Sequence, residues 1–504
     1  MPVEVAEVPQ AGATAIAATE TRVEWLVDNA GAYEAILNAL RGAQHSIRLS
    51  QLAFDADCVA YDEDGSATPL IDEIVAASCE RSVEVRILLN ESLLLDTATP
   101  LRRALAARGA SAVEVRGVSR FPQLLHAKVL VVDDREAILI GSPFANGYWD
   151  TSAHAPTDGR RPDRELGGRP VHDLSVQVMG RTARELADEF DEWWNCIASG
   201  SSGEDALCGV RGRSKSEDVA GIGVATTVPR RVLASRPAGR TDVLHALTKA
   251  INDAERLIYI EHQYLSCIQV LDALTRALER SPELEIIALL NQNPDVTAYR
   301  GWQNFRLRER GLLAHPRVGL FTLWTREALP NDVWAVNQVF VHSKAVIIDG
   351  QWATVGSANI DGVSLHSYGA DFTSRLGQWV FRDVRNIDVN ILLDASFPET
   401  QESIAALHTA LWSEHLGGEV LVDDIPASGW VAHWRDAAKC NIAVLNGASS
   451  ATGDRSFVLP YSTAPRPRAQ LKSLGVVEER LDVRFTPSWL EVHCSPNWIR
   501  NMFA

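Results

Sequence analysis

One arrangement of residues occurs twice in this chain, and the duplication constrains the fold more than any other feature. The pair His-x-Lys opens a run of β-branched residues in "LLHAKVLVVDD" and again in "FVHSKAVIIDG". Residues i and i+2 lie on the same face of a strand. We therefore expect His126 to point the same way as Lys128, and His342 the same way as Lys344. Two such pairs on otherwise apolar strands indicate a functional site.

The segments around the two pairs repeat as well. Residues 35–58 and 245–267 each read as an amphipathic helix, a polar break and a strand, and a further helix and a buried strand follow. Helices that alternate with strands predict sheets covered by helices on both faces. We expect an α/β fold whose parts are a first lobe over 20–200, a linker over 201–240, a second lobe over 241–420, and a C-terminal extension over 421–504 packed on the second lobe.

These residue types suit phosphoryl chemistry. Histidine titrates near neutrality without any perturbation, and a neighbouring lysine supplies a positive charge. A neutral imidazole can attack phosphorus while a second, protonated imidazole protonates the leaving oxygen, and the lysines stabilise the negative charge on the phosphoryl group. We expect neither a metal nor another cofactor to be needed.

The repeated motif His-x-Lys-x-x-x-x-Asp, followed by a Gly-Ser turn, resembles that of the phospholipase D superfamily. Flanking stretches resemble the family in order and spacing, among them "VHDLSVQVMG" (171–180), "IYIEHQYL" (258–265) and "LWSEHLG" (411–417). The resemblance covers most of residues 35–420. It implies two α/β/α sandwich lobes related by a pseudo-twofold axis, with one active site shared between them.

The resemblance also implies roles for individual residues. His126 would be the nucleophile and His342 the general acid and base. Asp173 and Asp388 match acidic positions that orient the histidines, although many relatives have Glu where this chain has Asp388. The residues implied to bind the phosphoryl oxygens are Lys128, Lys344 and Asn359.

The first copy departs from the family pattern in its turn. The second copy reads Gly-Ser-Ala-Asn and ends at Asn359, whereas the first reads Gly-Ser-Pro-Phe and ends at Phe144. Either the first half offers fewer phosphate donors, or Asn146 reaches in from a reshaped turn; we favour Asn146. Ser142 and Ser357, the serines of the two turns, are expected to contact the substrate.

Two further sets of residues have structural alternatives. Glu261, Gln263 and Tyr264 close a buried strand where similar enzymes line the substrate pocket, and the alternative is an exposed strand end. Asp133 and Asp349 lie seven residues after the histidines. Seven is odd, so in a regular strand these carboxylates face away from the site. We expect them to hold a strand end or a neighbouring element.

Composition and charge restrict the partners. A formal net charge of −17 argues against nucleic acid, which is bound through clustered Lys and Arg. No apolar run is long enough to span a bilayer. Seven scattered cysteines without CxxC spacing predict reduced thiols rather than a zinc site or a disulfide framework. We expect a monomeric cytoplasmic protein that meets phospholipid at a membrane or micelle surface; export without a leader stays open as an alternative.

The resemblance therefore implies a phospholipase D-type enzyme. It would hydrolyse or transphosphatidylate the distal phosphodiester bond of glycerophospholipids, giving phosphatidic acid through a covalent phosphohistidine. One alternative is a phosphodiesterase on another substrate, including a nuclease. Another is a catalytically silent scaffold, which the intact His-x-Lys pairs argue against and Phe144 keeps open.

Overall fold

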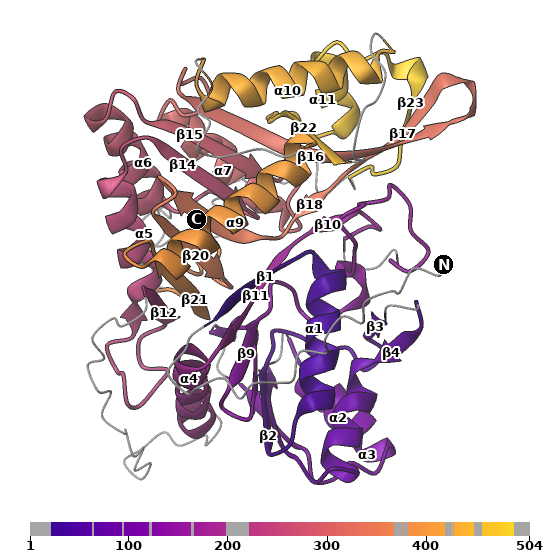
Figure 1. Cartoon of the computed structure of the whole chain (residues 1–504), viewed down its shortest axis with the longest axis vertical. Coiled ribbons are helices and arrows are strands. Elements are labelled where there is room, and N and C mark those ends of the chain that lie inside the picture. The colour runs from indigo at the N-terminus through magenta and orange to yellow at the C-terminus, as the bar shows by residue number, and fades with distance from the viewer. Residues whose placement is uncertain are drawn as a thin grey trace, which may run out of the picture.

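The structure is a computed structural model of the chain. It describes residues 22–62, 65–92, 95–119, 123–162, 166–197, 221–366, 375, 382–418, 426, 428–447 and 456–487. These residues form two lobes, each built on one large sheet with helices on both faces. In Figure 1 the first lobe, indigo to magenta, fills the lower part of the view and the second lobe the upper part. The α/β fold with two similar lobes is confirmed.

The sheet of the first lobe has seven strands in the order β1-β11-β9-β8-β2-β5-β6. Their bounds are β1 (Val23–Val27), β11 (Leu174–Met179), β9 (Glu136–Leu139), β8 (Val129–Val132), β2 (Ser46–Ser50), β5 (Glu84–Asn90) and β6 (Glu114–Val118). Side chains alternate between the two faces of a strand. Leu130 and Val132 therefore join the core beneath α1 (Asn29–Gly42), α2 (Leu70–Cys79) and α3 (Ala98–Ala107). Val129 and Val131 join the opposite core, with α4 (Arg181–Ile197).

The sheet of the second lobe runs β13-β12-β21-β20-β19-β14-β15-β16-β17-β23, with β22 paired to β16. Its strands are β13 (Arg240–Thr241), β12 (Ile222–Val228), β21 (Asn386–Asp394), β20 (Trp352–Gly356), β19 (Lys344–Ile348), β14 (Leu257–His262), β15 (Glu285–Leu290), β16 (Val318–Leu329), β17 (Val333–Gln338), β23 (Leu481–Val483) and β22 (Ser456–Pro460). One face packs on α5 (Asp242–Asp253), α6 (Ile268–Arg280) and α7 (Thr297–Glu309). The other packs on α9 (Pro398–Leu416) and α10 (Trp430–Leu445).

The lobe boundaries differ from those expected. Strand β12 lies inside the expected linker over 201–240, yet it pairs along its length with β21 in the second sheet. The second lobe therefore includes residues from 221 onward. The C-terminal residues do more than pack on this lobe, since β22 and β23 hydrogen-bond into its sheet.

Two short parallel pairings join the lobes. Strand β7 (Leu124–Leu125) of the first lobe pairs with the start of β21 in the second. Strand β10 (Val171–His172) of the first lobe pairs with β18 (Phe340–Val341) of the second. The first pairing carries the chain into His126, and the second brings the residues before His342 beside the residue before Asp173. Segments far apart in sequence thus meet at the lobe interface.

Two other expectations concern the cysteines and the membrane. Cys58, Cys79, Cys267 and Cys440 form no disulfide, but Cys196 is disulfide-bonded, so the expectation that all the thiols are reduced is wrong. Among the described helices, none combines the length and the apolar character needed to cross a membrane.

Candidate active site

The two histidines are each held by an aspartate of the other lobe. His126 Nδ1 lies 2.7 Å from Asp388 Oδ1, and His342 Nδ1 lies 2.9 Å from Asp173 Oδ2. All four residues are buried. A carboxylate at Nδ1 fixes the tautomer in which Nδ1 carries the proton and leaves Nε2 as the reactive nitrogen. The two pairs cross the lobe interface in opposite directions, so neither lobe alone has an oriented histidine.

The lysines lie against the same rings. Lys128 Nζ is 3.5 Å from His126 Nε2 and 3.1 Å from the His126 carbonyl oxygen. Lys344 Nζ is 3.4 Å from each ring nitrogen of His342. Burial, and next the charge of Lys344, lower the pKa of Lys128 to about 7. The two lysines therefore act on each other, which indicates that both halves contribute to one electropositive site.

Burial also sets the charge of the acidic and imidazole groups. Burial and the nearby lysines lower the pKa of His126, and they lower that of His342 to about 4, although the partner aspartates act in the opposite direction. Burial would raise the pKa of Asp173 and Asp388, but the facing histidines and lysines outweigh it, so both pKa values are lowered. Neutral imidazoles thus face ionised carboxylates at pH 7.

Both turns require glycine because the Asp-bearing strands approach them closely. A Cβ on Gly141 would lie 2.1 Å from Asp173 Oδ1, and a Cβ on Gly356 would lie 2.4 Å from the Val389 carbonyl oxygen. Ser357 Oγ donates to Asp388 Oδ1 at 2.9 Å, so this serine holds the aspartate that holds His126. Ser142, its counterpart in the first lobe, is fully buried.

The first-lobe turn does not bring Asn146 to the histidines. The Asn146 carboxamide donates to the Asp57 carbonyl at 2.8 Å and accepts from the Val59 amide at 2.9 Å, so it braces a neighbouring loop. Phe144, where an asparagine was expected, is 1% exposed and packs edge-on against Phe54 with ring centroids 5.0 Å apart. The expected substitution by Asn146 is therefore wrong.

Gln51 lies beside the His-x-Lys strand of the first lobe, although no sequence motif marks it. Ser50, the last residue of β2, pairs with Val129, so the next residue, Gln51, lies opposite Lys128. In the second lobe His262 occupies the equivalent place, because it pairs with Lys344. The Gln51 side chain is fully buried, and its carboxamide oxygen and nitrogen have no hydrogen-bond partner among the described residues. The signal was available in the repeat, where "SIRLSQ" and "LIYIEH" occupy equivalent places.

Asn359 lies at the matching turn of the second lobe. It is 5% exposed, and within the described part of the chain its carboxamide oxygen is buried without a hydrogen-bond partner. Gln51 thus offers an uncommitted amide group in the first lobe, and Asn359 an uncommitted carboxamide oxygen in the second.

Asp133 and Asp349 hold strand starts away from the histidines. Asp133 accepts three backbone N–H bonds of 2.8 to 3.0 Å, from residues 44–46 at the start of β2. Asp349 does the same for residues 255–257 at the start of β14, at 2.7 to 2.8 Å. Both have a φ of 54°, in the left-handed region that aspartate tolerates at turns.

The residues expected to line a pocket have different surroundings. Glu261 is fully buried and accepts hydrogen bonds from Ser343 Oγ at 2.8 Å and Tyr259 Oη at 3.0 Å. It therefore points into the protein, which contradicts a place on the pocket wall. Gln263 donates to Asp295 at 2.9 Å and to the Tyr264 hydroxyl at 3.0 Å. Contact of these last two residues with substrate stays a prediction.

Comparison with known proteins agrees with this geometry. The family described as "Cardiolipin synthase, PLD-like domain" matches the chain twice, over residues 36–151 and 247–370. Each match contains one His-x-Lys pair. The chain belongs to the phospholipase D superfamily.

The curated relatives are distant. Phospholipase D alpha 4 of Arabidopsis thaliana is 22% identical over 79% of the chain and 65% of its own length. Phospholipase D zeta 1 of the same plant is 27% identical over 58% of the chain and 30% of its own length. The chain thus spans about one to two thirds of the length of these relatives.

Two shorter proteins are covered more fully. Cardiolipin synthase B of Shigella flexneri is 21% identical over 77% of the chain and 87% of its own length. The crystal structure of a phosphatidylserine synthase from Haemophilus influenzae superposes with a TM-score of 0.50 over 77% of this chain and 84% of that one, at 13% identity. This last match supports the fold.

Proposed function

We propose that the chain is a phospholipase D-type phosphodiesterase that acts on the distal phosphodiester bond of glycerophospholipids. One observation carries this proposal. The two cross-lobe pairs, His126 with Asp388 and His342 with Asp173, hold two imidazoles beside two buried lysines. The site can then supply a nucleophile, an acid and positive charge to a single phosphorus atom.

In the first step, His126 Nε2 attacks phosphorus and the bond to the head-group oxygen breaks. That oxygen takes a proton from His342 Nε2, so the head group leaves as a neutral alcohol. In the free protein, burial and Lys344 oppose a proton on His342. An anionic phosphodiester beside Lys344 offsets the positive charge of that lysine and raises the pKa of His342. Substrate binding therefore favours the protonated ring that acts as the acid.

In the second step, His342 accepts a proton from water or from an alcohol. The oxygen attacks phosphorus, the bond to His126 Nε2 breaks, and phosphatidic acid or a new phospholipid is released. Asp388 and Asp173 keep both rings in place through the cycle, because each accepts from an Nδ1.

Four groups are proposed to bind the phosphoryl oxygens: Lys128, Lys344, Asn359 and Gln51. Gln51 supplies the amide that the first-lobe turn lacks, since Asn146 is committed elsewhere. Donors placed where negative charge develops stabilise the transition state without reorganising.

The net charge of the chain and the names of its relatives support a phospholipid substrate over a nucleic acid. The net charge is −17, and nucleic-acid binding relies on released counterions at basic surfaces. The relatives reported above are named for phospholipase D and cardiolipin synthase. The intact histidine and lysine sets argue against a silent scaffold.

The test is a product analysis with a panel of phospholipids in mixed micelles, a p-nitrophenyl phosphodiester and plasmid DNA. We expect phosphatidic acid and free head group from at least one phospholipid, and phosphatidyl alcohol when a primary alcohol is added. His126→Ala prepared in parallel controls for contaminating enzymes. Cleavage of DNA without any phospholipid turnover would replace the proposal by the nuclease alternative.

A further inference from the structure

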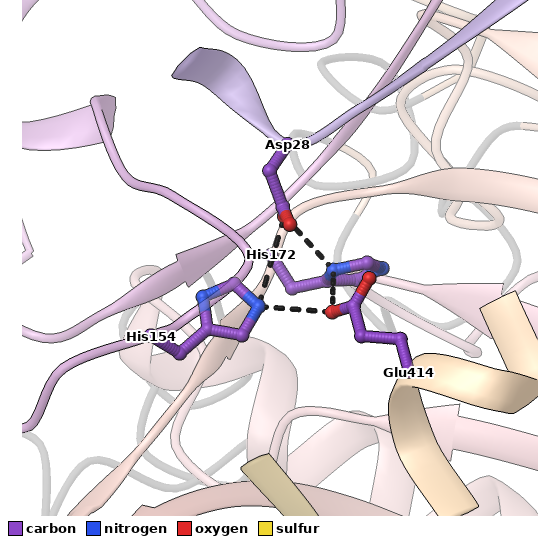
Figure 2. Close-up of side chains that lie close together, drawn as sticks. All are labelled: Asp28, His154, His172 and Glu414. Atoms are coloured by element: carbon purple, nitrogen blue, oxygen red, sulfur yellow. Dashed lines mark hydrogen bonds and ion pairs between the residues drawn. The ribbon is translucent and has the colours of Figure 1, made fainter. Parts of the chain in front are cut away.

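Four side chains from distant parts of the chain, three buried and one partly buried, meet next to the active site: Asp28, His154, His172 and Glu414 (Figure 2). Asp28 precedes α1, His154 follows the turn of the first lobe, His172 lies on β10, and Glu414 lies on α9. Asp28 and the two histidines are no more than 1% exposed, and the Glu414 side chain is 11% exposed. They are neither members of the His-x-Lys sets nor aspartates that orient them.

One atom of each side chain turns towards a common centre (Figure 2). His172 Nδ1 lies 3.0 Å from both Asp28 Oδ1 and Glu414 Oε1. His154 Nε2 lies 3.0 Å from the same Glu414 oxygen and 3.7 Å from the same Asp28 oxygen. Neither oxygen beside His172 meets the usual angular limits of a hydrogen bond from that ring.

We propose that these four atoms form a buried, four-coordinate site for a divalent transition metal of the zinc type. Zinc binds histidine nitrogen and carboxylate oxygen at about 2.0–2.2 Å in a tetrahedron, which places neighbouring ligand atoms about 3.3 Å apart. Four of the six distances between these atoms run from 3.0 to 3.7 Å and bracket that spacing, and all six lie within 4.8 Å.

The other nitrogen of each histidine meets a carboxylate, as in metal sites. His154 Nδ1 lies 2.9 Å from Asp150 Oδ2, and His172 Nε2 contacts Glu261 Oε1, although without the angle of a hydrogen bond. Asp150 is itself held by Arg161 at 2.7 Å. Metal-bound histidines regularly donate their second N–H to a carboxylate, which fixes the ring and raises its basicity. This arrangement also explains why Glu261 points inward.

Charge supports a cation at this place. Asp28 and Glu414 bring two carboxylates together in a buried space, and buried like charges without compensation are costly. A dication between them balances both, with the two imidazoles neutral. In the alternative arrangement no ion is bound and both imidazoles are protonated. The measurements below distinguish the metal site from this alternative.

Asp28 has an unusual backbone conformation, and its Oδ1 accepts a hydrogen bond from the Asp173 amide at 3.3 Å. Asp28 stands at the N-cap position of α1 with φ 61° and ψ 155°, an unusual conformation for a residue other than glycine. Its carboxylate does not cap the helix, which is the ordinary use of an aspartate at this position. The side chain is instead turned into the cluster.

A metal here would stabilise the acid side of the active site. The Asp28 amide donates to the Asp173 carbonyl at 2.8 Å, and the His342 amide donates to the His172 carbonyl at 2.7 Å. The ligands come from the first lobe and from α9 of the second, so the ion would clamp the interface. The proposal stands whether or not the protein cleaves phospholipids.

The first experiment measures the metal content of the full chain, purified without a histidine tag and passed through gel filtration in chelator. We expect about one equivalent of a single transition metal per chain, because a buried tetrahedral site exchanges its ion slowly. His154→Ala and Glu414→Gln should fall to background. His408→Gln, which alters a buried histidine of α9 outside the cluster, should keep the metal.

The second experiment needs no folded variant. Wild-type protein is unfolded in chelator and refolded with zinc, with cobalt or with neither. We expect zinc to raise the melting temperature and cobalt to give the intense visible absorption of a tetrahedral site. Wild-type protein without bound metal, whose melting temperature zinc leaves unchanged, would overturn the proposal and favour the protonated cluster.

Discussion

The two halves of the active site have matching histidines and lysines but differ in the neutral amide side chains beside them. In the second lobe, the turn after the His-x-Lys strand ends in Asn359, whose carboxamide oxygen has no hydrogen-bond partner among the described residues. In the first lobe, the matching residue is Phe144, which is part of a hydrophobic core, and Gln51 presents a buried amide from the neighbouring strand instead. If Gln51 and Asn359 have the proposed roles, the duplicated site keeps its histidines and lysines in matching places and takes its neutral donors from different ones.

The largest expected effects on activity come from replacing the two histidines, and the two variants should differ from each other. On phospholipid, His126→Ala and His342→Ala should each lower kcat/KM by more than about 10⁴-fold, because groups that act as a unit fail together. On a p-nitrophenyl phosphodiester, His342→Ala should release an initial burst of p-nitrophenol, because this leaving group needs little acid help. Equal loss in that burst for both variants would remove the distinction between nucleophile and acid.

We expect the two aspartates to affect different limbs of the pH profile of kcat/KM. We expect Asp388→Asn and Asp173→Asn to lower kcat/KM by about 10⁴-fold, as loss of a histidine-orienting carboxylate does elsewhere. Asp388 raises the pKa of His126, so its removal should shift the acidic limb of the kcat/KM profile to lower pH. Asp173 raises the pKa of His342, so its removal should shift the alkaline limb to lower pH.

Full pH profiles measured with a phospholipid, whose alcohol leaving group needs the acid, check this prediction. A merely structural role would lower the whole profile without moving either limb. Movement of the same limb in both variants would contradict the separate roles.

Amide donors should distinguish the two turns. We expect Gln51→Ala and Asn359→Ala to lower kcat by about 10²-fold, as removal of one transition-state donor typically does. Asn146→Ala should leave kcat unchanged and lower the free energy of unfolding by about 1–2 kcal/mol, because it removes two hydrogen bonds to a loop. Steady-state kinetics beside denaturant unfolding measure both quantities. A larger kcat loss for Asn146→Ala than for Gln51→Ala would restore the turn as the donor.

Brief chelation should have the smallest effect. Addition of EDTA at the start of an assay should change kcat by less than about twofold, because the lysines supply the positive charge at the phosphoryl group. The proposed buried metal is not expected to leave within that time. Immediate loss of turnover that a divalent ion restores would place a metal in the chemistry itself.

Sequence predicted those parts of the site that follow local rules. The period of two along a strand paired each histidine with its lysine, and the repeat predicted the two lobes. The partners Asp173 and Asp388 followed only from family resemblance, since nothing in their local sequence shows that they face a histidine of the other lobe.

Other features depend on contacts that no local pattern shows. Gln51 requires the register between two strands, and the four residues of the cluster in Figure 2 have no regular spacing. Its closeness in sequence to the turn predicts Asn146 as a phosphate donor. Phe144 packs on Phe54 instead, and the Asn146 carboxamide hydrogen-bonds to the Asp57 carbonyl in a neighbouring loop. The Gly/Ser-rich stretch before β12 predicts a linker, and only the pairing of β12 with β21 reveals a strand.

The most direct test of the account is to trap the covalent intermediate. His342→Ala is mixed with a phosphodiester that carries a p-nitrophenyl leaving group, quenched under alkaline conditions that preserve phosphohistidine, and digested for mass spectrometry. We predict that the phosphoryl adduct accumulates on His126, because the base for the second step is missing, and that His126→Ala shows none. An adduct on His342 in His126→Ala, or turnover by both variants without any adduct, would contradict it.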